Sequence, residues 1–330
     1  MKIKRFLSFL VFFNLFFCGS LMAKTITLKL ALMAPEDTSW AKNLIGMGKE
    51  VSEATKGRVD FLIYFGGTQG DEPDILRKMR INQLNGGVFT GKTLGEINGD
   101  IRVLEIPYTF FSDRDKAIKT LEAMTPYFNE KLEQKKMINL GFFELGMVYF
   151  VSKKKVDDLE SLKGVKIWTW QGDQLVESVI QNMKLVSVPL PLMDVLSSLS
   201  TGIVEAAYAP PLGILALQWN TKVKYLIDFP LAFSLGAILV SKSSWYQISP
   251  EDQKIVLKIS RENAAKLNSV NNKDNKEALL AMQDTGVQLI KFKEKDLVAA
   301  KAVRQDVIKQ LTGKLFSKEA FDKMEGILKQ

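Results

Sequence analysis

"GVKIWTWQGDQLVESVIQNMKLVSVPLPLMDVLSSLSTGIVEAAYAPP", residues 164–211, is the stretch that decides the expected fold. Three short apolar segments of strand length alternate with two segments of helical pattern, in the order 165–170, 173–183, 185–188, 193–200 and 203–207. Strands that alternate with helices in this way are typical of a parallel sheet covered by helices. The stretch therefore predicts an α/β fold.

Two tryptophans stand where the first of these strands ends. Trp168 and Trp170 are two of the five tryptophans in the chain, and alternate positions of a strand face the same side. Either both pack against a helix layer, or both face a ligand. Tyr208 ends the next strand but one, and in a parallel sheet such strand ends meet at one rim, where ligands bind. The sequence leaves both interpretations open.

A second series of the same kind comes earlier in the chain. Strands are expected at 26–32, 59–65 and 87–90, and a helical pattern separates each strand from the next. Asp71 and Glu72 precede Pro73, which suits the first turn of a helix because its missing N–H costs nothing there. We interpret the two acidic residues as a helix cap rather than as ligand groups.

Longer elements connect and follow the two series. A helical stretch near 113–136 leads to two expected strands at 138–143 and 147–152, and residues 250–284 predict one very long helix that Gly286 terminates. The repeated strand–helix pattern predicts two similar lobes rather than one sheet.

The first 23 residues have the layout of a secretory signal peptide. Lys2, Lys4 and Arg5 precede the apolar run 6–17, and small residues follow before Lys24. The alternative is a membrane anchor, but the run is short for a bilayer span. We expect cleavage after this segment and a periplasmic location.

The composition of the 330-residue chain excludes several kinds of site. It contains no histidine, and its one cysteine, Cys18, lies in the expected signal peptide. Ser-His-Asp and Cys-His catalysis and ordinary zinc sites are therefore excluded, and we expect no metal, no cofactor and no enzyme. A hydrolase that uses carboxylates alone remains an alternative, although no convincing acid pair stands out. The formal charge of +8 includes no long basic run, so nucleic acid is not an expected partner.

Two segments resemble a known family of transport proteins. They are "DLESLKGVKI" (158–167) and "DVLSSLSTGIVEAAYAPP" (194–211). In these segments and in the order of its elements the chain resembles the solute-binding proteins of tripartite ATP-independent periplasmic (TRAP) transporters, the dicarboxylate-binding family. The resemblance implies two α/β lobes joined by hinge strands, a ligand enclosed in the cleft, and a long helix that bridges both lobes.

The resemblance also implies a division of the chain and a partner. One lobe is expected to comprise 24–145 and 234–273, and the other 146–233 and 274–330. The expected protein is a monomer that delivers a small organic molecule to a TRAP-type permease. The alternative within the same fold is a ligand-sensing subunit that presents its bound state to a membrane receptor.

The chain departs from the family at three positions that bind ligand in its relatives. Trp168 stands where the family has the arginine of "LKGLKIR", Val148 stands at a second basic position, and Ala209 replaces the asparagine of "ENP". An arginine forms a bidentate, charge-assisted pair with a carboxylate, whereas indole offers one neutral N–H. We therefore expect a largely apolar or aromatic ligand, with any polar handle bound by Thr90, Glu144 or the backbone.

Ten residues are the expected ligand contacts: Trp168, Tyr208, Trp170, Thr90, Phe89, Glu144, Val148, Leu192, Trp219 and Met33. The competing hypothesis is that Trp168 only fills the space of the arginine in a protein that has lost binding.

Overall fold

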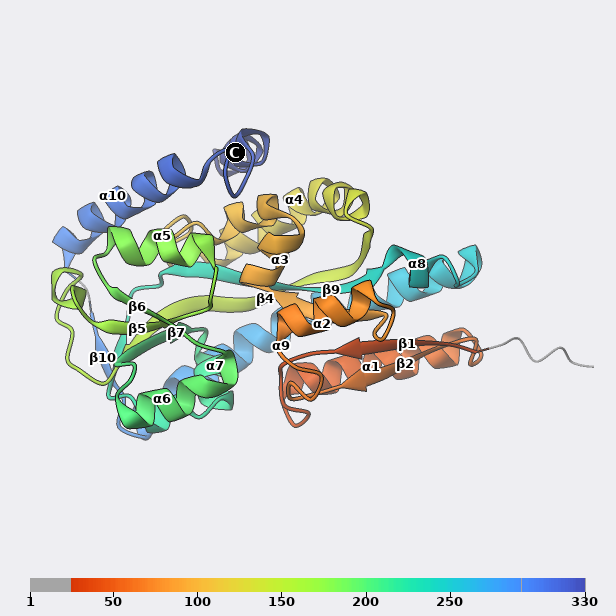
Figure 1. Ribbon diagram of the computed structural model, residues 1–330, viewed down its shortest axis with the longest axis horizontal. Coiled ribbons are helices and arrows are strands. Elements are labelled where there is room, and N and C mark those ends of the chain that lie inside the picture. The colour runs from red at the N-terminus through yellow and green to blue at the C-terminus, as the bar shows by residue number, and fades with distance from the viewer. Residues whose placement is uncertain (1–24, 292, 330) are drawn as a thin grey trace, which may run out of the picture.

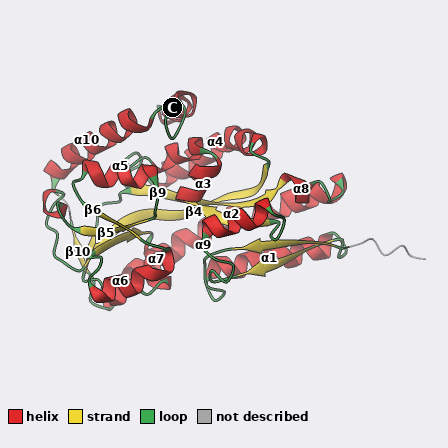
Figure 2. Ribbon diagram, viewed as in Figure 1, coloured by secondary structure: helices red, strands yellow, loops and turns green. Residues whose placement is uncertain are grey.

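A computed structural model describes residues 25–291 and 293–329 of the chain. The predicted signal peptide, 1–23, lies outside the described residues. Figures 1 and 2 show strands running through the middle of the molecule, with helices packed above and below them. In the described ranges no helix combines the length and the apolar character needed to cross a membrane.

Twenty-five elements follow one another along the described chain. Four are 3-10 helices, labelled η. In chain order the elements are β1 (Ile26–Ala31), α1 (Ser39–Ala54), β2 (Val59–Tyr64), α2 (Glu72–Arg80), β3 (Gly86–Thr90), α3 (Gly91–Ile97), η1 (Gly99–Glu105), α4 (Arg114–Gln134), β4 (Met137–Ser152), η2 (Glu160–Leu162), β5 (Lys166–Thr169), α5 (Gln174–Asn182), β6 (Val186–Pro189), η3 (Leu192–Asp194), α6 (Val195–Thr201), β7 (Ala206–Ala209), α7 (Pro211–Ala216), η4 (Trp219–Thr221), β8 (Tyr225–Ile227), β9 (Ala232–Ser241), α8 (Lys242–Trp245), α9 (Pro250–Asp284), β10 (Gln288–Ile290), α10 (Glu294–Leu311) and α11 (Lys318–Leu328).

Both predicted strand–helix series are present, and each forms parallel strand pairs. In the first series β1 pairs with β2 and with β3, and in the second β5 pairs with β6 and with β7. Helix α1 buries Leu44, Met47 and Val51, which lie on one face at the spacing of a helix. These pairings confirm the α/β fold.

Strand β4 corrects two expectations. The predicted strands 138–143 and 147–152 are one strand of 16 residues, which carries irregularities at Asn139/Gly141 and Glu144/Gly146. Gly146 has a φ of +128°, which side chains disfavour, so glycine lets the strand bend there without ending. The two series are also not separate sheets, because β4 pairs with β9 along residues 137–148 and lies between β7 and β8 at Val151 and Ser152.

The long helix α9 has the predicted bounds, and its asparagines stabilise the bend in β4. Asn268 Oδ1 accepts a hydrogen bond from the backbone N–H of Glu144 at 2.8 Å. Asn271 and Asn275 donate through Nδ2 to the carbonyls of Glu144 and Leu145, at 2.6 and 2.8 Å. A bulged strand leaves backbone groups without a ladder partner, and these side chains satisfy them.

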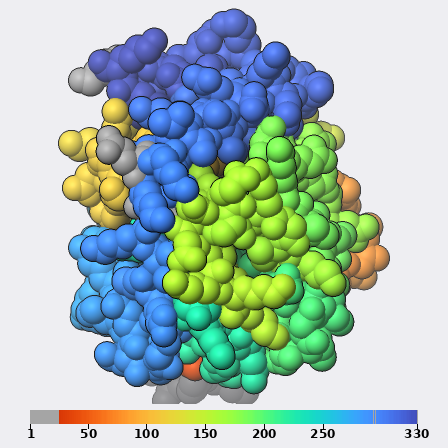
Figure 3. Space-filling model, turned by 90° about the vertical axis from the view of Figure 1, so that its left-hand side faces the viewer, coloured from red at the N-terminus to blue at the C-terminus, as the bar shows by residue number. Residues whose placement is uncertain are grey.

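The C-terminal helices return to elements formed much earlier. Helix α10 packs on α5, and α11 packs on α4 and η1. The end view in Figure 3 shows the last residues, in blue, above the yellow-green segment that follows β4. There Lys295 forms an ion pair with Asp158 at 2.6 Å, and Asp296 accepts from the N–H of Leu159. The residue boundaries of the two lobes stay a prediction.

The close contact of α9 with β4 leads to a prediction for Gly141. A Cβ there would come within 2.6 Å of Ala264 Cβ on α9, a distance that forces the helix or the strand to shift. We expect Gly141→Ala to lower the free energy of unfolding by about 1–3 kcal/mol in urea titration.

Gly46→Ala is the control for this substitution. Gly46 lies inside α1 with no atom within 4 Å of its added Cβ, so alanine should be neutral or stabilise by up to about 1 kcal/mol. Equal stabilities of the two variants would contradict the close packing of α9 on β4.

Candidate functional site

A cavity of about 200 Å³ lies where the two strand–helix series meet. The ends of β5 and β7 and helix α7 line one side of it, and the segment after β1, the start of α2 and the end of β3 line the other. Its lining is mainly apolar and aromatic. The cavity thus has the position at the strand ends that the sequence predicts for a ligand site.

Eight of the ten residues predicted to contact ligand line this cavity. They are Met33, Thr90, Val148, Trp168, Trp170, Leu192, Tyr208 and Trp219. These residues come from seven separate stretches of the chain, which the fold brings together.

The structure places the other two predicted contacts outside the cavity. Phe89 is fully buried in the hydrophobic core, because alternate residues of β3 face opposite sides and Val88 and Thr90 take the cavity side. Glu144 pairs with Arg114 and borders a different hollow of the surface. Burial raises the pKa of Glu144, and the hydrogen bond and charge of Arg114 oppose that rise.

Trp168 is the centre of an aromatic cluster on the cavity wall. Its ring centroid lies 5.1 Å from that of Tyr208, 5.4 Å from that of Trp219 and 5.5 Å from that of Trp170. Its Nε1 donates to the carbonyl of Leu190 at 3.0 Å, so its one polar group is already bonded. Trp168 is only 2% exposed and forms a fixed part of the wall. Trp170 and Tyr208 are half-buried.

The three positions at which the resemblance implies a departure from the family pattern lie together on this cavity. Trp168, Val148 and Ala209 all line it. Among the described residues that line the cavity there is no lysine or arginine. The described lining of this cavity therefore offers no cation to neutralise a buried carboxylate, although Lys92 and Arg102 line an adjoining compartment.

Among the described residues that line the cavity, Glu72 is the one carboxylate, and it is 2% exposed. It accepts hydrogen bonds from Thr90 N at 2.9 Å and from Thr90 Oγ1 at 2.7 Å, at the N-terminus of α3. Burial raises its pKa to about 7, against the opposing effect of hydrogen bonds from Thr90 and Thr93; the charge of Asp71 raises it further.

Asp71 caps helix α2, as the sequence predicts, and also contacts the aromatic wall. Its side chain accepts from the N–H of Glu72 at 2.8 Å. Its Oδ2 accepts from Trp170 Nε1 at 3.1 Å, which links the start of α2 to the end of β5. This contact thus joins the two predicted lobes beside the cavity.

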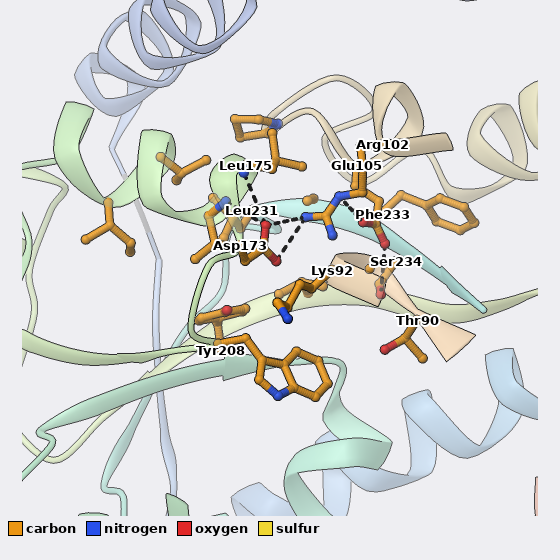
Figure 4. A pocket seen from close by; sticks show the side chains of 18 of the residues that line it. Thr90, Lys92, Arg102, Glu105, Asp173, Leu175, Tyr208, Leu231, Phe233 and Ser234 are labelled. Carbon is orange, nitrogen blue, oxygen red and sulfur yellow. Dashed lines mark hydrogen bonds and ion pairs between the residues drawn. The ribbon is translucent and has the colours of Figure 1, made fainter. Parts of the chain in front are cut away.

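A second, smaller compartment of about 100 Å³ adjoins the cavity behind Thr90, Trp170 and Tyr208, which line both. Figure 4 shows Arg102 reaching across it toward Asp173. Arg102 Nη2 lies 3.0 Å from Asp173 Oδ1.

Arg102 is already compensated by two carboxylates. Its Nε also lies 3.1 Å from Glu105 Oε2, and its Nη1 has no hydrogen-bond partner among the described residues. Burial alone would lower the pKa of Arg102, but the charges of Asp173 and Glu105 outweigh burial and raise it. Burial likewise raises the pKa of Glu105, which Arg102 opposes.

Sequence reasoning missed the roles of Glu72 and Arg102. Glu72 was expected only to favour a helix start, and no local pattern indicates that it turns toward Thr90, 18 residues away. Arg102 pairs with Asp173, 71 residues away, so its burial depends on how η1 packs against α5. No spacing in the sequence reports such contacts.

Comparison with known proteins gives consistent results. The model of the bacterial extracellular solute-binding proteins, family 7 (DctP), matches residues 30–315. A solute-binding protein of Chromohalobacter salexigens is 24% identical over 267 residues, which is 79% of this chain and 77% of the relative.

Two solved structures illustrate the likeness of fold. A TRAP periplasmic solute-binding protein from Desulfovibrio salexigens with bound orotic acid superposes with a TM-score of 0.84 at 18% identity, covering 92% of this chain and 99% of that one. An extracytoplasmic solute receptor of Bordetella pertussis binding pyroglutamic acid gives a TM-score of 0.85 at 15% identity, with the same coverages.

The raised pKa of Glu72 predicts a pH dependence of stability. Between its unfolded pKa of 4.5 and about 7 the native protein binds a proton that the unfolded chain releases, so the free energy of unfolding falls as pH rises. From pH 5 to pH 8 the wild-type protein should lose about 2–3 kcal/mol relative to Glu72→Gln. Urea titrations at both pH values measure this difference, and parallel pH profiles of the two proteins would contradict it.

Proposed function

Since the chain belongs to family 7 of the bacterial extracellular solute-binding proteins, we propose that it captures a small, largely apolar or aromatic organic ligand and delivers it to a TRAP-type membrane permease. The ligand occupies the cavity of about 200 Å³ between the strand–helix series. The protein performs no catalytic step, and the predicted signal peptide directs it to the periplasm.

The observation that carries the proposal is the chemistry of the cavity wall. Trp168 stands at the position of the family arginine, and none of the described residues lining the cavity is basic. A carboxylate enclosed there would lose its hydration without gaining a counter-charge, at a cost of several kcal/mol. Aromatic and aliphatic side chains instead favour a ligand that buries apolar surface or stacks on a ring.

The proposed ligand differs in kind from those of the two structural neighbours. Orotic acid and pyroglutamic acid, which those proteins bind, are both carboxylic acids. At 18% and 15% identity the likeness concerns the fold, and the residues that would grip an acid can change while the fold is kept. The replacements at Trp168, Val148 and Ala209 are changes of that type.

Capture proceeds by closure of the two lobes. The ion pair of Arg102 with Asp173 and the hydrogen bond of Trp170 with Asp71 each join the predicted lobes beside the cavity. Both contacts would break when the lobes separate and form again on closure. A closed, ligand-bound form is then the state that the permease recognises.

Native mass spectrometry and a thermal-shift screen test the ligand class. We expect the purified protein to retain a small apolar or aromatic molecule, and the screen to give its largest stabilisation with molecules of that class. Tight binding of a C4-dicarboxylate, a uronate or a sialic acid would refute the proposal, as would a bound structure in which an arginine grips the carboxylate.

Substitution of Trp168 tests the role of the aromatic cluster. Trp168→Phe removes ring area at the wall and the hydrogen bond to Leu190, so the affinity for the retained ligand should fall at least tenfold in calorimetry. Trp245→Phe is the matched control, since Trp245 is also buried but does not line the cavity. Unchanged affinity in Trp168→Phe would favour the hypothesis that Trp168 only fills space.

A further inference from the structure

The charge of the cavity wall points to one more property of the ligand. Glu72 takes part in no ion pair within the described residues, although it is almost completely buried. Its hydrogen-bond donors are the backbone and side chain of Thr90, together with Thr93, all of them uncharged. A buried carboxylate without a counter-ion is unusual, because charge is ordinarily buried only with a partner.

Three aromatic side chains that line the same cavity as Glu72 are suited to binding a cation. Trp40, Trp170 and Tyr208 line the cavity and are only half-buried, so part of each ring is available to a ligand. Trp40 is supported by Phe143 at a centroid distance of 6.1 Å. The electron-rich faces of such rings attract cations, most strongly where water is excluded.

Asp71 adds to the negative character of this wall. Its Oδ2 holds Trp170 through the indole N–H, so a carboxylate lies at the edge of that ring. Two carboxylates thus border the aromatic wall, and none of the described lining residues is a lysine or arginine. Among the described residues, two cations line the adjoining compartment, and both are paired: Arg102 with Asp173 and Glu105, and Lys92 with Glu96 at 2.6 Å.

We propose that the ligand carries a compact, weakly hydrated cation, a protonated or methylated amine, which binds between Glu72 and the aromatic wall formed by Trp40, Trp170 and Tyr208. This inference rests on the proposed function, since it names the polar part of a largely apolar ligand. Glu72 is then the residue that selects for charge, and the aromatic wall accepts the alkyl groups around it.

Three probes of one shape and different charge test the inference. They are choline, its neutral analogue 3,3-dimethylbutan-1-ol and the anion 3,3-dimethylbutanoate. In calorimetry at pH 8 we expect choline to bind at least tenfold more tightly than the alcohol, and the anion not to bind.

The outcomes separate this inference from the proposed function. If the alcohol binds as well as choline, or if none of the three binds at 10 mM, the cation site is refuted while a neutral apolar ligand remains. If the anion binds most tightly, both the inference and the proposed function fail.

Variants and pH identify Glu72 as the group responsible. Glu72→Gln should weaken choline at least tenfold and leave the alcohol unchanged. Asp100→Asn is the matched control: Asp100 is also buried, accepts hydrogen bonds from Tyr127 and the N–H of Ser317, and lies outside the cavity lining. Equal loss of choline affinity in both variants would overturn the role of Glu72.

The pH profile gives a readout that a structural role of Glu72 would not produce. Choline keeps its charge at every pH, so any titration arises in the protein. Burial raises the pKa of Glu72 to about 7, and the charge of the neighbouring Asp71 raises it further. The hydrogen bonds from Thr90 and Thr93, which are uncharged, oppose this rise. Choline affinity should therefore fall from pH 8 to pH 6 in the wild type, and a flat profile would refute the site.

Discussion

Strand β4 pairs with β9 from Met137 to Val148, and its next four residues pair with β7 instead. Because β9 and β7 lie on opposite edges of β4, this strand joins the two parallel series into one connected sheet. The pairing with β9 ends at Val148, on the cavity wall. The bend at Gly146 leaves backbone groups of β4 without ladder partners, which asparagines of α9 satisfy. The long helix is therefore a structural requirement of the bend as well as a bridge, and the site forms where the sheet changes direction.

The charges around the cavity are distributed unevenly, and this distribution decides what can bind. The smaller compartment contains Arg102, but a carboxylate entering it would meet Asp173 and Glu105, which already compensate that guanidinium. Arg102 is thus poorly suited to replace the arginine that the family places at Trp168. Arg102 joins η1 to the start of α5, and its Nη1 has no hydrogen-bond partner among the described residues.

Much of the architecture could be predicted from the sequence, because it depends on local patterns. Apolar periodicity gave the parallel series and the full extent of 250–284, and the cap at Asp71 followed from residue type and position. The single strand β4 was missed, because a glycine bulge and a turn look alike in a sequence. Phe89 points into the core, while its neighbours Val88 and Thr90 line the cavity, and the sequence does not show which face of the strand is which. Glu144 pairs with Arg114, a contact that the sequence does not reveal. The position of Glu72 on the cavity wall depends on its hydrogen bonds with Thr90, which no local sequence pattern predicts.

Glu72 can serve as a helix cap and as a ligand group at the same time. Thr90 N–H and Oγ1 fix the direction of its carboxylate at the start of α3, but dipoles alone leave its charge only partly stabilised, which is why its pKa lies about neutrality. A cation in the cavity would supply the absent charge and favour the ionised form. Ligand binding and proton release are then two sides of one equilibrium, and the same carboxylate that destabilises the empty cavity at high pH would strengthen the complex there. The cost of burying Glu72 without a counter-ion would therefore make the proposed site responsive to a positively charged ligand.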